Sequence, residues 1–238
     1  MVVVAVFSAC LVFLLGAPAP AEGHLLWLQM EGSGLTIYHG HPPGLGLDSS
    51  SPKEVPIENV LRASCFEESG NGAALDSVGA YPIDFGGPCA AASALVSSGY
   101  WTKTPYGTKN VPKNEAESPI SSWLSYESVK HLATWSDAFA APLTGDLEIV
   151  PLHDPFSLDE GDKLRLLVTI EGKPAAGAIV VYDGKPRGET DSEGHVNVKI
   201  RRSGLQMILA SHRTPLQSEK ADEIVRTAVL SFALEEKP

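Results

Sequence analysis

The segment KLRLLVTI, Lys163–Ile170, is rich in branched apolar residues, and the turn sequence EGKP at residues 171–174 ends it. Branched side chains favour strands, whereas glycine and proline interrupt them. Apolar segments of the same kind follow at residues 178–182, 195–200, 205–211 and 227–234. Short strands separated by turns about every 8–12 residues are typical of a β-sandwich. We therefore predict that residues 146–238 form an immunoglobulin-like antiparallel β-sandwich.

The preceding part of the chain, residues 24–145, indicates a second β-rich domain. Strands are expected at residues 24–30, 35–39, 59–65 and 92–101, where apolar, β-branched or aromatic residues gather. Gly32 and Gly34 provide a turn between the first two of these strands. The fold class expected for the chain is therefore mainly β, with two β-rich domains.

One helix is expected within the N-terminal domain. Ser118 and Pro119 resemble a helix start, with a capping hydroxyl followed by proline at the first helical position. Apolar residues then recur close to helical spacing at Ile120, Trp123, Leu124, Leu132 and Trp135. This pattern predicts a helix from about residue 119 to about residue 135.

The first apolar run indicates export. Residues 2–15 are almost wholly apolar, and the small residues Ala19 and Ala21 follow in an A-x-A pattern, as cleavage of a signal peptide requires. The run is too short for a comfortable membrane span. We predict a signal peptide at residues 1–23 and a periplasmic or extracellular protein. Cleavage after Ala21 and after Gly23 both stay open, as does a lipoprotein anchored at Cys10.

Charge and composition exclude some classes of function. The 238 residues carry a formal net charge of −11, which argues against nucleic-acid binding because that needs basic patches. Hydrophobic residues make up 43% of the chain, enough for packed cores. No second apolar stretch is long enough to cross a bilayer, so the mature chain is expected to be soluble.

Two cysteines remain outside the predicted signal peptide, Cys65 and Cys89. An even pair in an oxidising compartment favours one disulfide. The alternative is a pair of free buried thiols.

The predicted cleavage site lies just ahead of His24 and suggests a metal chelate. Cleavage after Ala21 places His24 third, so that the amine, two amides and the imidazole can enclose Cu(II) or Ni(II) in a square plane. Cleavage after Gly23 places His24 first, and the amine then chelates together with its own ring. Both positions make the mature N-terminus a candidate site for a divalent transition metal.

His39 and His41 are the further ligands that the sequence predicts. Residues two apart on a strand project from the same face, and Gly40 between them has no side chain to obstruct a ligand. If the first strand pairs with the second, His24 comes near His39 or His41. Imidazole suits nickel, cobalt and copper. The alternative is a pair of exposed loop histidines, and the sequence leaves open whether His153 or His212 joins the site.

Several segments resemble one family. They are HLLWL at residues 24–28, GHP at 40–42, GDLEIVPL at 145–152 and GKP at 172–174. They resemble a bacterial periplasmic family of domains of unknown function that is associated with nickel and cobalt uptake. Some relatives carry a C-terminal membrane helix, which this sequence lacks. The resemblance therefore implies a soluble binding component with a membrane metal-uptake transporter as partner.

The expected function is an exported, soluble protein that binds nickel, cobalt or copper for uptake or buffering. It is not expected to be an enzyme, because the sequence contains neither a G-x-S-x-G nor an H-E-x-x-H motif. Two alternatives stay open. One is a copper-dependent oxidative enzyme that uses an N-terminal histidine, and the other is a structural or adhesive β-sandwich without a metal.

Overall fold

The computed structural model describes residues 25–40, 42, 52–75 and 78–235. The predicted signal peptide, together with His24 and His41, lies outside these residues. The chain is mainly β, as expected, and its strands form three sheets. Within the described residues no helix is long and apolar enough to cross a membrane.

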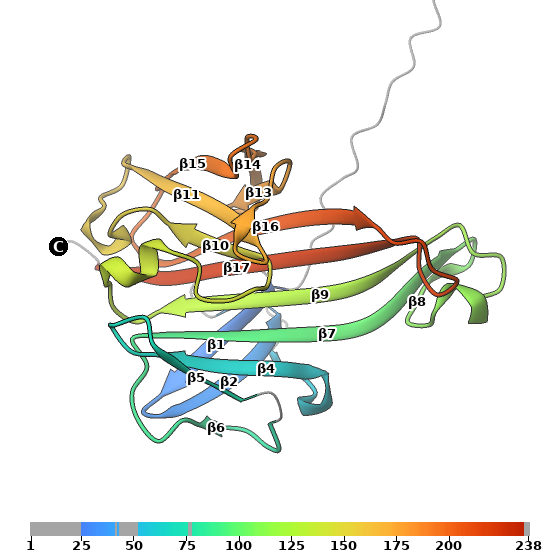
Figure 1. Cartoon of the computed structure of the whole chain (residues 1–238), viewed down its shortest axis with the longest axis horizontal. Coiled ribbons are helices and arrows are strands. Elements are labelled where there is room, and N and C mark those ends of the chain that lie inside the picture. Colours follow the sequence, from blue (N-terminus) through green and yellow to red (C-terminus); the bar gives the residue numbers. More distant parts are fainter. Residues whose placement is uncertain (1–24, 41, 43–51, 76–77, 236–238) are drawn as a thin grey trace, which may run out of the picture.

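The largest sheet, here the central sheet, has nine strands. Eight lie in the order β14-β13-β16-β17-β9-β7-β4-β5, and β8 pairs with β7. Their bounds are β4 Val60–Phe66, β5 Gly72–Leu75, β7 Ala91–Thr104, β8 Gly107–Lys109, β9 Ser121–Leu132, β13 Ile179–Tyr182, β14 Lys185–Glu189, β16 Gly204–Pro215 and β17 Glu223–Leu234. All neighbours pair antiparallel except β9 and β17, which are parallel. The last strand of the chain therefore joins the N-terminal and C-terminal strands into one sheet (Figure 1).

Two smaller sheets cover the central sheet. The hairpin sheet contains β1 Leu25–Glu31, β2 Gly34–Gly40, β3 Lys53–Glu54 and β6 Ile83–Asp84. The C-terminal sheet contains β10 Glu148–Pro151, β11 Lys163–Ile170, β12 Lys173–Pro174 and β15 His195–Lys199. In Figure 1 they lie on opposite sides of the long strands β9 and β17. The central sheet is therefore the middle layer of three.

Alternation along β9 and β17 explains the two cores. Val129 and Val229 are paired neighbours and pack with Leu26 of the hairpin sheet. Leu230, the residue after Val229 on β17, packs with Leu164 of the C-terminal sheet, because successive strand residues point to opposite faces. The central sheet thus buries apolar side chains on both faces.

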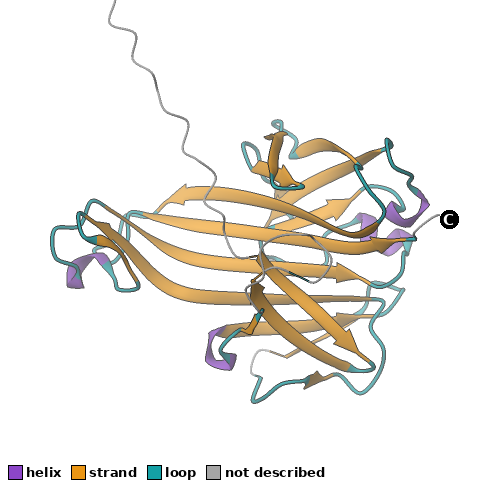
Figure 2. Cartoon of the chain, turned by 180° about the vertical axis from the view of Figure 1, so that it is seen from behind, coloured by secondary structure: helices purple, strands orange, loops and turns teal. Residues whose placement is uncertain are grey.

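The expected helix at residues 119–135 is wrong. Most of this segment, residues 121–132, forms β9, which pairs with β7 on one side and with β17 on the other. Ser118 has a φ of 51°, and Ile120 is 61% exposed, so the assumed capping signal and apolar stripe do not exist. Pairing with two strands supplies hydrogen bonds and burial that outweigh a weak local helical pattern. The described residues contain four short 3₁₀ segments, seen in Figure 2: η1 Ile57–Asn59, η2 Lys113–Glu115, η3 Asp137–Ala140 and η4 Pro155–Ser157.

The boundary predicted at residues 145 and 146 lies just before β10, but the central sheet extends across it. The division into two domains, 24–145 and 146–238, stays a prediction. The immunoglobulin-like class of the C-terminal half also stays a prediction. The antiparallel strands predicted there are present as β11, β13, β15, β16 and β17.

A buried ion pair links the central sheet to the C-terminal sheet. Lys130 of β9 lies 2.5 Å from Glu148 of β10, and both side chains are only 3% exposed. The Glu148 carboxylate also accepts hydrogen bonds from the backbone N–H groups of Leu143 and Thr144 and from the Thr144 hydroxyl. Burial of a charged pair is tolerated only when such additional bonds satisfy it.

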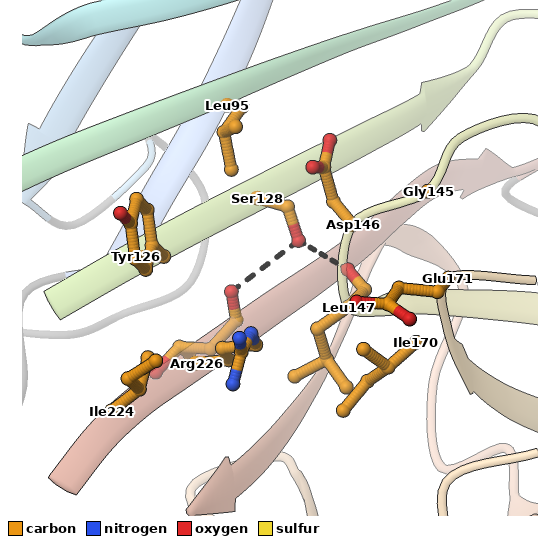
Figure 3. Close-up of a pocket in the computed structure, with 11 residues that line it drawn as sticks. Leu95, Tyr126, Ser128, Gly145, Asp146, Leu147, Ile170, Glu171, Ile224 and Arg226 are labelled. Carbon is orange, nitrogen blue, oxygen red and sulfur yellow. Dashed lines mark hydrogen bonds between the residues drawn. The ribbon is translucent and has the colours of Figure 1, made fainter. Parts of the chain in front are cut away.

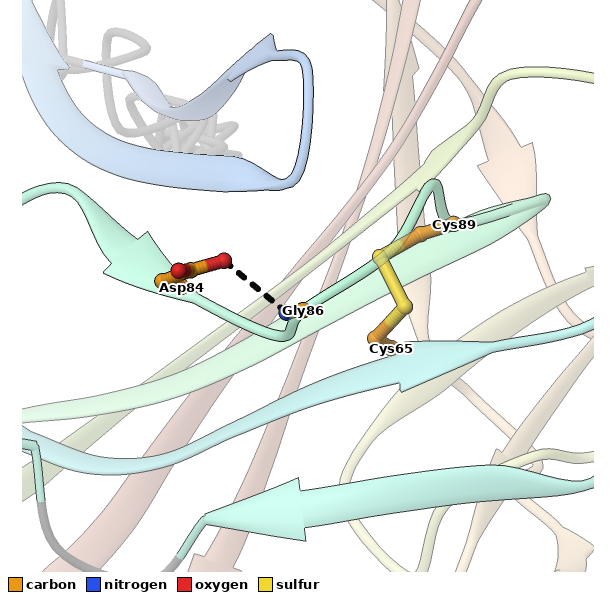
Figure 4. Close-up of a disulfide and its surroundings, with 4 residues drawn as sticks. All are labelled: Cys65, Asp84, Gly86 and Cys89. Carbon is orange, nitrogen blue, oxygen red and sulfur yellow. Dashed lines mark hydrogen bonds between the residues drawn. A yellow bond between two sulfur atoms is a disulfide. The ribbon is translucent and has the colours of Figure 1, made fainter.

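The predicted disulfide is confirmed. Cys65 of β4 is bonded to Cys89, which lies just ahead of β7 (Figure 4). Cys65 pairs across the strands with Ala92. The bridge therefore joins the start of β7 to the strand next to it.

Replacing Cys65 and Cys89 together by alanine is expected to lower the free energy of unfolding by about 3.5 kcal/mol, because a bridge across 24 positions removes entropy from the unfolded chain. Urea unfolding of the mature protein measures this. Thiol titration of the unfolded, unreduced protein is expected to find no free thiol, and two titratable thiols would contradict the bridge.

Glu148→Gln is expected to lower the free energy of unfolding by about 3–5 kcal/mol, because it leaves the Lys130 ammonium buried without a countercharge. The control is Glu223→Gln, which removes the partner of exposed Arg213 and is expected to cost less than about 1 kcal/mol. Urea unfolding compares the two variants. Equal losses would mean that the buried pair adds no more than a surface pair.

Candidate functional site

The candidate metal site lies at the open end of the β1–β2 hairpin, where Leu25 pairs with Gly40, and the turn lies at the other end. Gly32, with a φ of 61°, takes the left-handed conformation that the tight turn needs. The two strands then pair in register, with Leu26 opposite His39 and Leu25 opposite Gly40. The pairing of the first two strands, which the sequence analysis took as a condition for the site, is present.

His39 faces the central sheet. It lies two residues from Ile37, which is fully buried in the core between the two sheets, and residues two apart share a face. The His39 Nε2 atom is 3.6 Å from the Glu127 carboxylate of β9. The His39 side chain is 43% exposed and that of Glu127 is 21% exposed. An imidazole and a carboxylate from two sheets therefore meet at an accessible place.

His24 and His41, the other two predicted ligands, lie outside the described residues. In the sequence they adjoin Leu25 and Gly40, the outermost pair of the two strands among the residues that the structure describes. No group of three or more His, Cys, Asp or Glu residues that could hold a metal occurs among the residues that the structure does describe. The three-histidine site stays a prediction.

The other histidines lie apart from His39. His153 Nε2 accepts a hydrogen bond from the Arg165 backbone N–H. His195 of β15 lies within 4.0 Å of Asp191 and Glu193. The Nδ1 atom of His212 is buried and has no hydrogen-bond partner among the described residues.

His131 of β9 is a half-buried residue of the central sheet. Its Nδ1 atom lies 3.0 Å from the Ser231 hydroxyl of β17. Burial lowers the pKa of the His131 imidazole below its usual value of 6.5, because the charged form loses solvation. The folded protein therefore favours neutral His131.

This shift predicts a loss of stability in mild acid. Above about pH 6.5 His131 is neutral in both the folded and the unfolded chain, and as the pH falls the unfolded chain takes up the proton first. The free energy of unfolding is therefore expected to fall as the pH drops from about 6.5 towards the lower pKa of the folded chain, and to level off below it. His131→Gln should reduce this dependence, whereas His195→Gln, at a more exposed site, is the control. Urea unfolding between about pH 7.5 and pH 5 measures it, and identical pH profiles for the native chain and His131→Gln would contradict it.

A cavity of about 240 Å³ lies on the other face of β9, where the central sheet meets the ends of β10 and β11. Figure 3 shows Tyr126 and Ile224 on one side, Asp146 and Glu171 on the other, and Arg226 between them. The sequence analysis did not predict this cavity.

Two residues near these sites, Glu127 and Arg226, escaped the sequence analysis. Glu127 lies in the segment that was expected to be a helix, and its approach to His39 depends on packing between two sheets. Arg226 lies on β17, whose pairing with β9 is parallel and joins residues about a hundred positions apart. Strand alternation in β9 offers the only local signal for Glu127, since Glu127 and Val129 share a face.

Comparison with known proteins found one family. The family described as "Domain of unknown function (DUF4198)" matches residues 50–214, more than half of the chain. No curated protein and no solved structure matches the chain.

Proposed function

The chain belongs to the DUF4198 family, whose function is unknown, and we propose that it is an exported protein that binds a divalent late transition metal. Nickel, cobalt or copper is the metal, and uptake or buffering is the role. The protein binds the metal and does not catalyse a reaction. It acts in the periplasm or outside the cell, and a membrane metal-uptake transporter is its partner.

The observation that carries this proposal is the approach of His39 to Glu127. The imidazole and the carboxylate lie 3.6 Å apart, at the end of the hairpin where Leu25 pairs with Gly40. The next residue in sequence beyond each of these two is a histidine, His24 or His41. The proposed site therefore combines the mature N-terminus and His24 with His39 and His41.

The donor set suits late transition metals. Neutral imidazole nitrogens bind nickel, cobalt and copper well, and an amine beside an imidazole adds a chelate. The Glu127 carboxylate contributes negative charge next to His39, which stabilises a bound cation and orients the ring. Ligation needs a deprotonated amine and neutral imidazoles, so affinity depends on pH.

The same proposal includes the finer architecture. An immunoglobulin-like C-terminal half, residues 146–238, would support an N-terminal half, residues 24–145, that carries the metal. The central sheet, which contains strands from both halves, would hold Glu127 in place for the hairpin sheet.

Titration calorimetry with nickel and with copper tests the site. The protein is exported so that it carries its native N-terminus, which mass spectrometry identifies. A version with one extra N-terminal methionine and the His24→Ala variant are expected to lose the most affinity, because both remove the amine-imidazole chelate. His39→Ala and His41→Ala should lose less. Glu127→Gln should weaken binding about tenfold, as loss of a group that supports a ligand does. Affinity should also fall below about pH 6.

His195→Ala is the matched control, because His195 lies in the C-terminal sheet beside two carboxylates. It is expected to bind metal as the native chain does. Equal binding by the native protein, the extended protein and His24→Ala would place the metal elsewhere. Absence of binding would favour a structural β-sandwich. Oxidation of a polysaccharide by the copper-loaded protein with peroxide would favour the enzymatic alternative.

A further inference from the structure

The cavity of about 240 Å³ on the far face of β9 carries an inference independent of the metal. β9 and β17 form its floor. Its rim is formed by residues 145–147, just before β10, and by residues 170–171, at the end of β11. The rim is held in place, since the Glu171 backbone N–H donates to the Gly145 carbonyl at 2.9 Å. Ser128 of the floor also donates a hydrogen bond to the Leu147 carbonyl of the rim (Figure 3). The cavity is therefore formed before any ligand arrives.

Opposite charges line this cavity without neutralising each other. Arg226 lies on the floor, and its Nη1 donates to the Thr214 hydroxyl at 2.8 Å. Among the described residues its guanidinium forms no ion pair within 4.0 Å, and neither does the carboxylate of Glu171 on the rim. Asp146 is already paired with Arg62 at 2.5 Å. Arg226 and Glu171 are thus the two charges left for a ligand.

Apolar side chains form part of the remaining walls, beside the polar Ser128 and Thr227. The apolar residues are Leu95, Tyr126, Leu147, Ile170 and Ile224. Small-molecule sites typically combine such walls with a few polar groups that orient the ligand. A ligand suited to this cavity carries one negative group, one positive group and an apolar side chain.

We propose that the cavity binds a free amino acid with an apolar side chain. The guanidinium of Arg226 keeps further N–H donors beyond the one bonded to Thr214, and a guanidinium fork matches the two oxygens of a carboxylate. The carboxylate of Glu171 pairs with the ammonium group. The side chain lies against the apolar walls. Binding at this site does not depend on the metal site, since His39 and Glu127 face the other side of the central sheet.

Titration calorimetry with L-leucine and L-phenylalanine tests the proposal on the metal-free mature protein. Arg226→Gln and Glu171→Gln are each expected to weaken binding about tenfold or more, the usual effect of losing a hydrogen bond to a charged group. The controls are Arg213→Gln, one strand away and paired with Glu223, and Glu193→Gln beside His195. Both controls are expected to bind as the native chain does.

Two leucine analogues separate the charges. Leucinamide lacks the carboxylate, so it should bind the native protein more weakly than L-leucine does. Its affinity should differ little between the native protein and Arg226→Gln. 4-Methylpentanoate lacks the amine and should be insensitive to Glu171→Gln. Thermal unfolding checks that each variant folds. If Arg226→Gln does not fold, the comparison of L-leucine with 4-methylpentanoate in Glu171→Gln still tests the proposal, because Glu171 is exposed. The proposal is overturned if neither amino acid binds, or if binding is unchanged in Glu171→Gln.

Discussion

The ion pair between Lys130 and Glu148 is the constraint on which the C-terminal side of the molecule depends. The buried Glu148 carboxylate forms an ion pair with the Lys130 ammonium of β9 and accepts hydrogen bonds from the N–H groups of Leu143 and Thr144. It thereby holds the chain that enters β10 against the central sheet. Gly145 and Asp146 lie in that chain, and Gly145 in turn fixes the Glu171 turn. The rim of the cavity therefore owes its position to a charge pair that does not line the opening itself.

The parallel pairing of β9 with β17 is the second constraint. It places the last strand between strands from both halves, so neither half of the central sheet is complete until the C-terminal residues arrive. Such pairing joins residues about a hundred positions apart, and contacts of this range slow folding because loop closure comes first. It also brings Val229 into one core and Leu230 into the other. β17 thereby contributes side chains to both cores, as β9 does with Val129 and Leu132.

One strand serves both candidate sites. Along β9, Glu127 faces His39 of the hairpin sheet, whereas its neighbours Tyr126 and Ser128 line the cavity on the opposite face. Strand geometry makes this arrangement possible, because successive side chains point to opposite faces. The proposed metal and amino-acid sites thus lie on opposite faces of the central sheet at β9 and share no side chain.

Local patterns in the sequence determined the β-rich fold, the first hairpin and the disulfide. Alternating and branched residues, separated by glycine turns, need no distant partner to indicate strands, and an even pair of cysteines in an oxidising compartment has one pairing available. Tertiary structure alone decided that residues 121–132 are a strand, because their apolar spacing suits a helix as well, and only β7 and β17 on either side select the extended form. It also decided the partners of Glu127, Lys130 and Arg226. A charged residue in a sequence does not specify which side chain it will face, since that depends on how sheets pack across many residues.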